Sequence, residues 1–153
     1  MKVFLLIFLS FCLGLVSCKS TDSNIKPIKT VLWYSNANED LVLKGLEQWK
    51  EVGLKYKKGN PDFFRTLIVR FVPASEMSNK EWLGEYSDHE ILINRDEKLS
   101  KEERENVISH EFGHFLGLEH TNDKGSIMNV NSSLKTKVSK EDIKKAQDQL
   151  MKN

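Results

Sequence analysis

Three of the four histidines in this 153-residue chain lie between His110 and His120, in the segment HEFGHFLGLEH. His110 and His114 are four residues apart, so on an α-helix they differ by about 40° and project from one face, one turn apart. Gly117 follows, where a glycine in the left-handed conformation can end the helix and turn the chain. The spacing therefore predicts a helix and a sharp turn that returns His120 to the other two histidines.

The three imidazoles form a candidate zinc site. Two histidines four residues apart on a helix suit zinc, and a third leaves one tetrahedral position open for water. An open position is typical of catalytic rather than structural zinc sites. Glu111 lies on the same side of the helix, close enough to reach a water on the metal without being a ligand. The opposite face is apolar and is expected to pack into the core, through Ile108, Phe112 and Phe115.

This histidine segment resembles the extended zinc signature of the metzincin metallopeptidases, and Ser126-Ile127-Met128 resembles their Met-turn. A looser similarity to the matrixin branch covers most of residues 30–152. The resemblance implies that the three histidines bind one catalytic zinc ion, and it leaves calcium open. It also implies that Glu111 is the general base and acid, and that Met128 lies beneath the metal.

The chain departs from the resemblance in three places. Both cysteines, Cys12 and Cys18, lie in or at the edge of the apolar N-terminal leader, so the thiol switch that keeps many matrixins latent is not expected. His89 is the only other histidine, which does not support the family's additional histidine-rich structural zinc site. Val130 stands two residues after Met128, where some metzincins have a tyrosine, and this argues against the astacin and serralysin branches.

Residues 1–17 are predicted to form a lipoprotein signal peptide. Lys2 gives a positive start, and residues 3–16 are almost entirely apolar. Leu15-Val16-Ser17-Cys18 resembles the lipobox of bacterial lipoproteins, in which the cysteine is lipidated. We therefore expect a lipid on Cys18, a flexible tether up to residue 29, and a catalytic domain over residues 30–153. The alternative is an ordinary signal peptide with an unpaired cysteine.

The balance of charges limits the partners that we expect. Lys2 is the only charged residue of the leader, so the mature chain would carry 22 basic and 22 acidic residues. A neutral domain is a poor nucleic-acid binder. We expect a monomer with a protein or peptide substrate that contacts the membrane only through its lipid. The predicted location is the bacterial cell envelope, and Lys19 after Cys18 favours the outer membrane.

The remaining chain interleaves strands and helices, which predicts an α+β fold with a mixed sheet covered by helices. The expected strands are residues 31–34, 66–72 and 91–93, with a loop at 84–90. The expected helices are residues 38–52, residues 100–116, and a C-terminal helix capped by Ser139 and Asp142. The metzincin resemblance implies a twisted sheet whose antiparallel edge strand, residues 91–94, binds an extended substrate. Residues 122–134 are expected to line the pocket for the residue after the cut.

These features predict a zinc endopeptidase. Zinc would lower the pKa of its water to about 7, and Glu111 would carry the proton from that water to the leaving amine. The alternatives are a non-catalytic zinc- or peptide-binding lipoprotein, and hydrolysis of a non-protein amide such as a cell-wall crosslink. Glu111 favours catalysis, because zinc binding alone needs no carboxylate at that position.

Overall fold

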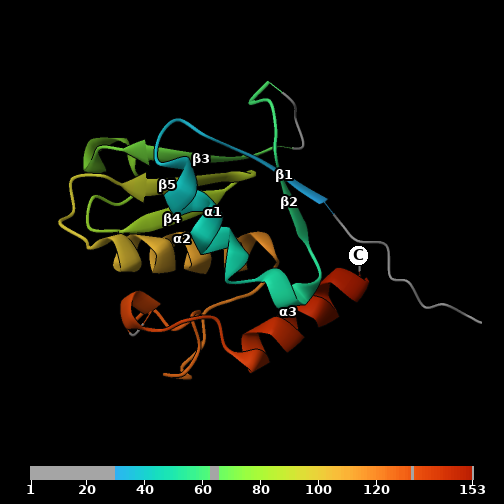
Figure 1. Cartoon of the computed structure of the whole chain (residues 1–153). Helices are drawn as coiled ribbons and strands as arrows, with labels where there is room; N and C mark the ends of the chain where they lie inside the picture. Colours follow the sequence, from blue (N-terminus) through green and yellow to red (C-terminus); the bar gives the residue numbers. More distant parts are fainter. Residues whose placement is uncertain (1–29, 63–65, 132, 153) are drawn as a thin grey trace, which may run out of the picture.

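Five strands form a single sheet in the order β2-β1-β3-β5-β4 (Figure 1). The computed structural model describes residues 30–62, 66–131 and 133–152, so the predicted signal peptide, Cys18 and tether lie outside it. The strands are β1 (Thr30–Ser35), β2 (Lys55–Lys58), β3 (Thr66–Val72), β4 (Gly84–Ser87) and β5 (Glu90–Asn94). β4 runs antiparallel to β5, and the other neighbouring strands are parallel. The predicted mixed sheet with an antiparallel edge strand is therefore confirmed.

The helices lie on one side of this sheet. They are α1 (Glu39–Glu47), α2 (Lys101–Phe115) and α3 (Lys140–Lys152). Short 3₁₀ turns also occur at Lys50–Val52, Ala74–Glu76 and Ser133–Lys135. α2 lies beneath the sheet, and α3 lies beneath α2 together with the segment that links them (Figure 1). Within the described residues, none of the helices has the length and apolar character needed to cross a membrane.

One hydrophobic core fills the space between the sheet and the helices. Alternate residues of the central strands point into it, as expected for a sheet with one buried face. Val42, Leu46 and Trp49 are fully buried there, as are Ile108 and Phe112 of the face predicted to be apolar. Phe115, predicted for the same face, is only partly buried at the margin of the core. This core fixes α2, and hence the histidines that α2 carries, against the sheet.

α2 begins and ends as predicted. At its start, Ser100 Oγ accepts a hydrogen bond from the Glu103 amide, and the Glu103 carboxylate accepts one from the Ser100 amide. At its end, Gly117 has φ 85°, and its amide donates to the His114 carbonyl while the next amide, of Leu118, donates to the Gly113 carbonyl. This pair of bonds is the Schellman arrangement that ends a helix at a left-handed glycine.

The predicted edge strand is wrong. β5, which contains residues 91–94, lies between β3 and β4 and is internal. Its Ile91 and Ile93 are fully buried, because helices cover this face and strands flank both sides. The antiparallel edge strand is β4, within the segment predicted to be a loop.

The first helix also differs from its prediction. α1 ends at Glu47, and a 3₁₀ turn then carries the chain to Gly53, which has φ 88°. Asn38 occupies the N-cap position in a left-handed conformation with φ 54°, but its side chain makes no capping hydrogen bond. An asparagine side chain caps best from extended backbone, which this residue does not have.

Candidate active site and metal centre

The three histidines converge as their spacing predicts. His110 and His114 project from the last turns of α2, and the Gly117 turn brings His120 back to them. The Nε2 atom of His120 lies 3.1 Å from the Nε2 atoms of both His110 and His114. Within the described part of the chain, they form the one His, Cys, Asp or Glu cluster with metal-ligand geometry.

Backbone carbonyls fix the protonation of two of these rings. His110 Nδ1 lies 2.7 Å from the Ile127 carbonyl oxygen, and His114 Nδ1 lies 2.8 Å from that of Leu118. Because a carbonyl only accepts, each Nδ1 carries the proton and each Nε2 presents a lone pair. Burial lowers the pKa of His110 to about 4 and also lowers the pKa of His114, so both rings are neutral at pH 7.

This donor set fits zinc. Three imidazole nitrogens that converge at these distances can share one cation that lies between them. Tetrahedral zinc with Zn–N bonds of about 2.0–2.1 Å places its ligand nitrogens roughly 3.3 Å apart, close to the separations found here. The hydrogen bonds from Nδ1 to carbonyl oxygens are the outer contacts that orient metal-ligating histidines.

Glu111 lies beside the histidines, beneath the edge strand β4. Its side chain is buried, with 7% of its surface exposed. Gly84 leaves room for it, because a Cβ atom at that position would lie 2.8 Å from Glu111 Oε1. Burial, followed by the nearby charge of Glu85, raises the pKa of Glu111 to about 8. A divalent cation next to the carboxylate opposes this rise.

The predicted Met-turn residue packs against α2 between the two helical ligands. Met128 is 2% exposed, and its sulfur occupies the space that a side chain at Gly113 would need. Trp49 contacts the same space and donates a hydrogen bond from Nε1 to the Ser109 carbonyl, at 3.0 Å. Met128 therefore forms a buried floor under the turn of α2 that carries the histidines.

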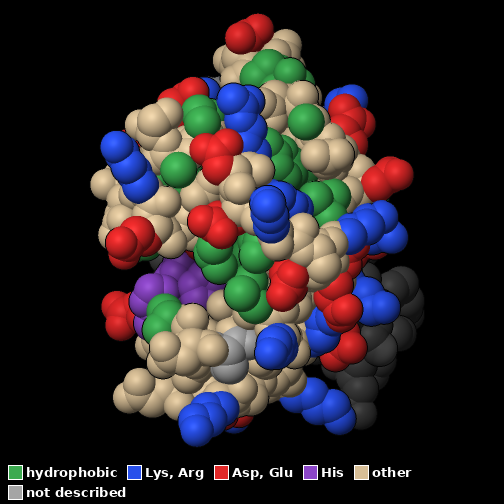
Figure 2. Space-filling view, turned by 90° about the vertical axis from the view of Figure 1, so that its left-hand side faces the viewer, with side chains coloured by type: hydrophobic (Ala, Val, Ile, Leu, Met, Phe, Trp, Pro, Cys, Tyr) green, Lys and Arg blue, Asp and Glu red, His purple; other side chains and the backbone are tan. Residues whose placement is uncertain are grey.

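An open cleft of about 600 Å³ runs along the site. The histidines and Glu111 line it, together with β4 residues Gly84 and Tyr86 and with Val130 and Ser133. The last two belong to the segment predicted to line the substrate pocket. Trp82, 47% exposed, and Val130, 57% exposed, add apolar surface. Figure 2 shows the histidine side chains at the molecular surface, bordered by hydrophobic and acidic side chains.

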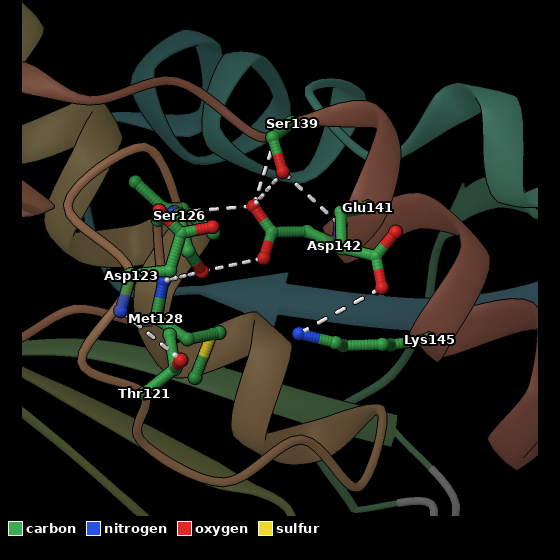
Figure 3. Close-up of polar contacts among 9 residues, drawn as sticks. Thr121, Asp123, Ser126, Met128, Ser139, Glu141, Asp142 and Lys145 are labelled. Atoms are coloured by element: carbon green, nitrogen blue, oxygen red, sulfur yellow. Dashed lines mark hydrogen bonds and ion pairs between the residues drawn. The ribbon is translucent and has the colours of Figure 1, made fainter.

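Asp142 is a residue of this site that the sequence indicated only as a helix cap. Its buried carboxylate lies against the segment predicted to be the Met-turn, where it accepts hydrogen bonds from Ser126 Oγ and the Ile127 amide (Figure 3). The sequence contained the cap pattern with Ser139, but no local spacing links residue 142 to residues 126 and 127. His89, in contrast, is exposed and lies outside both the cleft lining and the histidine cluster.

Comparison with known proteins gives the family. The Matrixin peptidase family matches residues 66–150, more than half of the chain, from β3 through most of α3. The chain belongs to the matrixin family. This matrixin is a zinc metalloendopeptidase, and its zinc-binding triad is His110, His114 and His120, with Glu111 beside it. The predicted enzyme class and the single catalytic zinc ion are confirmed.

A solved structure supports the same fold for this matrixin. Archaemetzincin from Methanopyrus kandleri superposes with a TM-score of 0.59 at 13% sequence identity, covering 81% of this chain and 96% of that chain. At this identity the likeness concerns the fold, and the metzincin-like α+β architecture is confirmed. A comparison with curated protein sequences finds no match.

Proposed function

We propose that this matrixin is an envelope-anchored endopeptidase that cleaves extended polypeptide segments. The observation that carries the proposal is the convergence of three Nε2 atoms beside a buried carboxylate, on the wall of an open cleft. The cleft is bordered by β4, which pairs with β5 on one side only. A metal site, a proton carrier and a strand edge therefore lie together.

The histidines and Glu111 have different roles in the proposed peptide hydrolysis. The histidine triad would hold zinc, which supplies positive charge that acidifies water and stabilises negative charge on the scissile carbonyl oxygen. Glu111 accepts a proton from the attacking water at its carboxylate and then donates that proton to the nitrogen of the leaving amine. The cation that the neighbouring histidines would hold opposes the rise in pKa that burial causes, and so favours the ionised carboxylate that can accept this proton.

The cleft favours an extended substrate with an apolar side chain near the cut. A strand edge with unpaired backbone groups binds an extended peptide by adding a strand. Trp82 and Val130 then offer apolar surface to the substrate side chains. The backbone at Trp82 is held in place, because the fully buried Asn94 donates a hydrogen bond from Nδ2 to its carbonyl, at 3.0 Å.

The proposed location rests on the leader sequence. The lipobox-like segment that ends at Cys18 supports a lipid anchor, and the polar residues up to 29 would separate that lipid from β1. We propose that the enzyme works in the bacterial cell envelope, on the outer membrane, as a monomer whose substrates are proteins or peptides.

Replacing Glu111 with glutamine tests the catalytic assignment. The chain from Lys19 onward is incubated with a diverse peptide library, with and without a chelator, and the cut sites are mapped by mass spectrometry. The parent should cleave only without the chelator. Glu111→Gln should keep about one zinc per chain and lower kcat/KM by at least about 10²–10⁴-fold, because the proton carrier is lost.

Each other outcome contradicts a specific part of the proposal. Full cleavage by Glu111→Gln would refute the role of that carboxylate. A parent protein that binds zinc and leaves every peptide intact would be a non-catalytic zinc- or peptide-binding protein. Cleavage confined to isolated cell-wall crosslinks would replace the polypeptide substrate with a non-protein amide.

A further inference from the structure

The carboxylate of Asp142 is buried among neutral hydrogen-bond donors at the start of α3 (Figure 3). Its side chain is 1% exposed. Oδ2 accepts hydrogen bonds from the Ser139 amide at 2.9 Å, from Ser139 Oγ at 2.8 Å and from the Ile127 amide at 3.1 Å. Oδ1 accepts one from Ser126 Oγ at 2.5 Å. Four donors offset the cost of removing this charge from water.

These contacts reach a zinc ligand through one residue. Ile127 donates its amide proton to Asp142, and its carbonyl oxygen accepts the proton on His110 Nδ1, at 2.7 Å. Ser126 Oγ, which donates to Asp142, also accepts a hydrogen bond from the Met128 amide at 3.0 Å. Asp142 therefore holds both the residue that orients His110 and the residue that forms the floor of the site.

A helix cap alone does not require this arrangement. The cap of α2 has the same pattern, with Glu103 in the place of Asp142. There, among the described residues, the acidic side chain bonds only to the N-cap residue, in a solvent-accessible position. At α3 the corresponding carboxylate is buried and extends to Ser126 and Ile127, about fifteen residues earlier in the chain. The additional contacts point to a second role.

We propose that Asp142 is a positioning residue of the metal centre, which fixes Ile127 so that its carbonyl holds the His110 ring in the orientation that binds zinc. The packing of α3 and the affinity for zinc are then coupled, and by reciprocity zinc stabilises the N-terminus of α3. The inference rests on the zinc function proposed above.

The test measures zinc affinity by competition with a chromophoric chelator, in the chain from Lys19 onward. Asp142→Ala should weaken zinc binding by about 10–100-fold, the usual effect of removing an outer contact to a metal ligand. Ser139→Ala is the matched control, because it removes the side-chain cap of α3 and leaves the contacts of Asp142 with Ser126 and Ile127. It should change zinc affinity by less than about twofold.

A conservative variant separates positioning from general destabilisation. Asp142→Asn keeps an oxygen that can accept from the Ile127 amide, so it should retain most of the zinc affinity that Asp142→Ala loses. Ser126→Ala, which removes one contact and keeps that with Ile127, should fall between them and serves if Asp142→Ala does not fold. Urea unfolding of the metal-free variants shows how much stability each has lost.

Hydrogen exchange adds a readout that does not depend on cleavage. Zinc should slow exchange of the amides of Ile127 and Asp142 in the parent, and this effect should be lost in Asp142→Ala. Equal zinc affinities for Asp142→Ala and Ser139→Ala would overturn the proposal and leave Asp142 as a helix cap. A parent chain that binds no zinc would instead contradict the proposed function.

Discussion

Between the two zinc ligands of α2, Gly113 leaves its side-chain position to the sulfur of Met128. At a solvent-exposed position inside a helix, replacing glycine with alanine would stabilise the helix by about 1 kcal/mol. Here the new Cβ atom would meet that sulfur and lie 3.1 Å from Trp49 Cζ2, and both side chains are buried. Overpacking of this kind costs about 1–3 kcal/mol, so the clash outweighs the propensity gain.

We therefore expect Gly113→Ala to lower the free energy of unfolding, measured by urea denaturation of the metal-free chain. Gly125→Ala is the control, because its Cβ atom would have its nearest neighbour, Asp123 Oδ1, at 3.4 Å. The control should change stability by no more than about 0.5 kcal/mol. A Gly113→Ala variant as stable as the parent would show that Met128 does not fill this position.

Local spacing accounts for the site residues that the sequence could predict. His110, Glu111 and His114 lie within two turns of one helix, so helix geometry alone places them together. The carbonyl of Ile127 carries no side-chain signal, and its bond to His110 spans 17 residues. Its orientation is set by tertiary packing, and so is the second role of Asp142.

At the scale of the element, the cap of α2 should make stability depend on pH. The hydrogen bond with the Ser100 backbone is the largest cause that lowers the pKa of Glu103, and a hydrogen bond with the Ser100 side chain adds to it. The Glu103 carboxylate then binds a proton less tightly in the folded chain than in the unfolded chain. Its contribution to the free energy of unfolding is therefore fully present above the unfolded pKa, and it is lost as pH falls through the lowered folded pKa.

Glu103→Gln removes this titration. We expect the stability difference between the parent and Glu103→Gln to be largest near pH 7 and to shrink as pH approaches 3, in urea denaturation of both proteins with a chelator present. The chelator keeps zinc release from contributing to the comparison. A difference that stays constant across this range would show that the Glu103 charge does not stabilise the cap.

The elements that the sequence predicted well are those with a strong apolar pattern or a cap. β3 matches its predicted residues. The start and the end of α2 are both determined by residues close by in the sequence, the Ser100 cap and the Gly117 turn. The two strands that were not predicted lie at the edges of the sheet. β2 reads Lys-Tyr-Lys-Lys with only Tyr56 partly buried, and β4 is four residues long and begins with glycine. Edge strands are short and polar, so they lack the alternation that reveals a strand.

At the scale of the whole molecule, the proposed anchor is tested at Cys18. The full chain is expressed in a bacterium that processes lipoproteins and is supplied with a labelled fatty acid. The parent should incorporate the label and sediment with membranes, whereas Cys18→Ala should not be labelled, because the acceptor thiol is gone. Cys12→Ala is the matched control and should keep the label. Labelling of Cys18→Ala would contradict the lipobox interpretation.

The three ligands are not held equally. His110 and His114 are fixed by hydrogen bonds from Nδ1 to backbone carbonyls, whereas His120 is exposed and makes no such bond with residues 30–62, 66–131 or 133–152. The helix therefore offers two preset ligands, and the third comes from a more accessible loop. We expect His120 to govern the rate at which the zinc ion exchanges. Dissociation of this one ligand would open the coordination shell, while the nitrogens of His110 and His114 stay in place for the next ion.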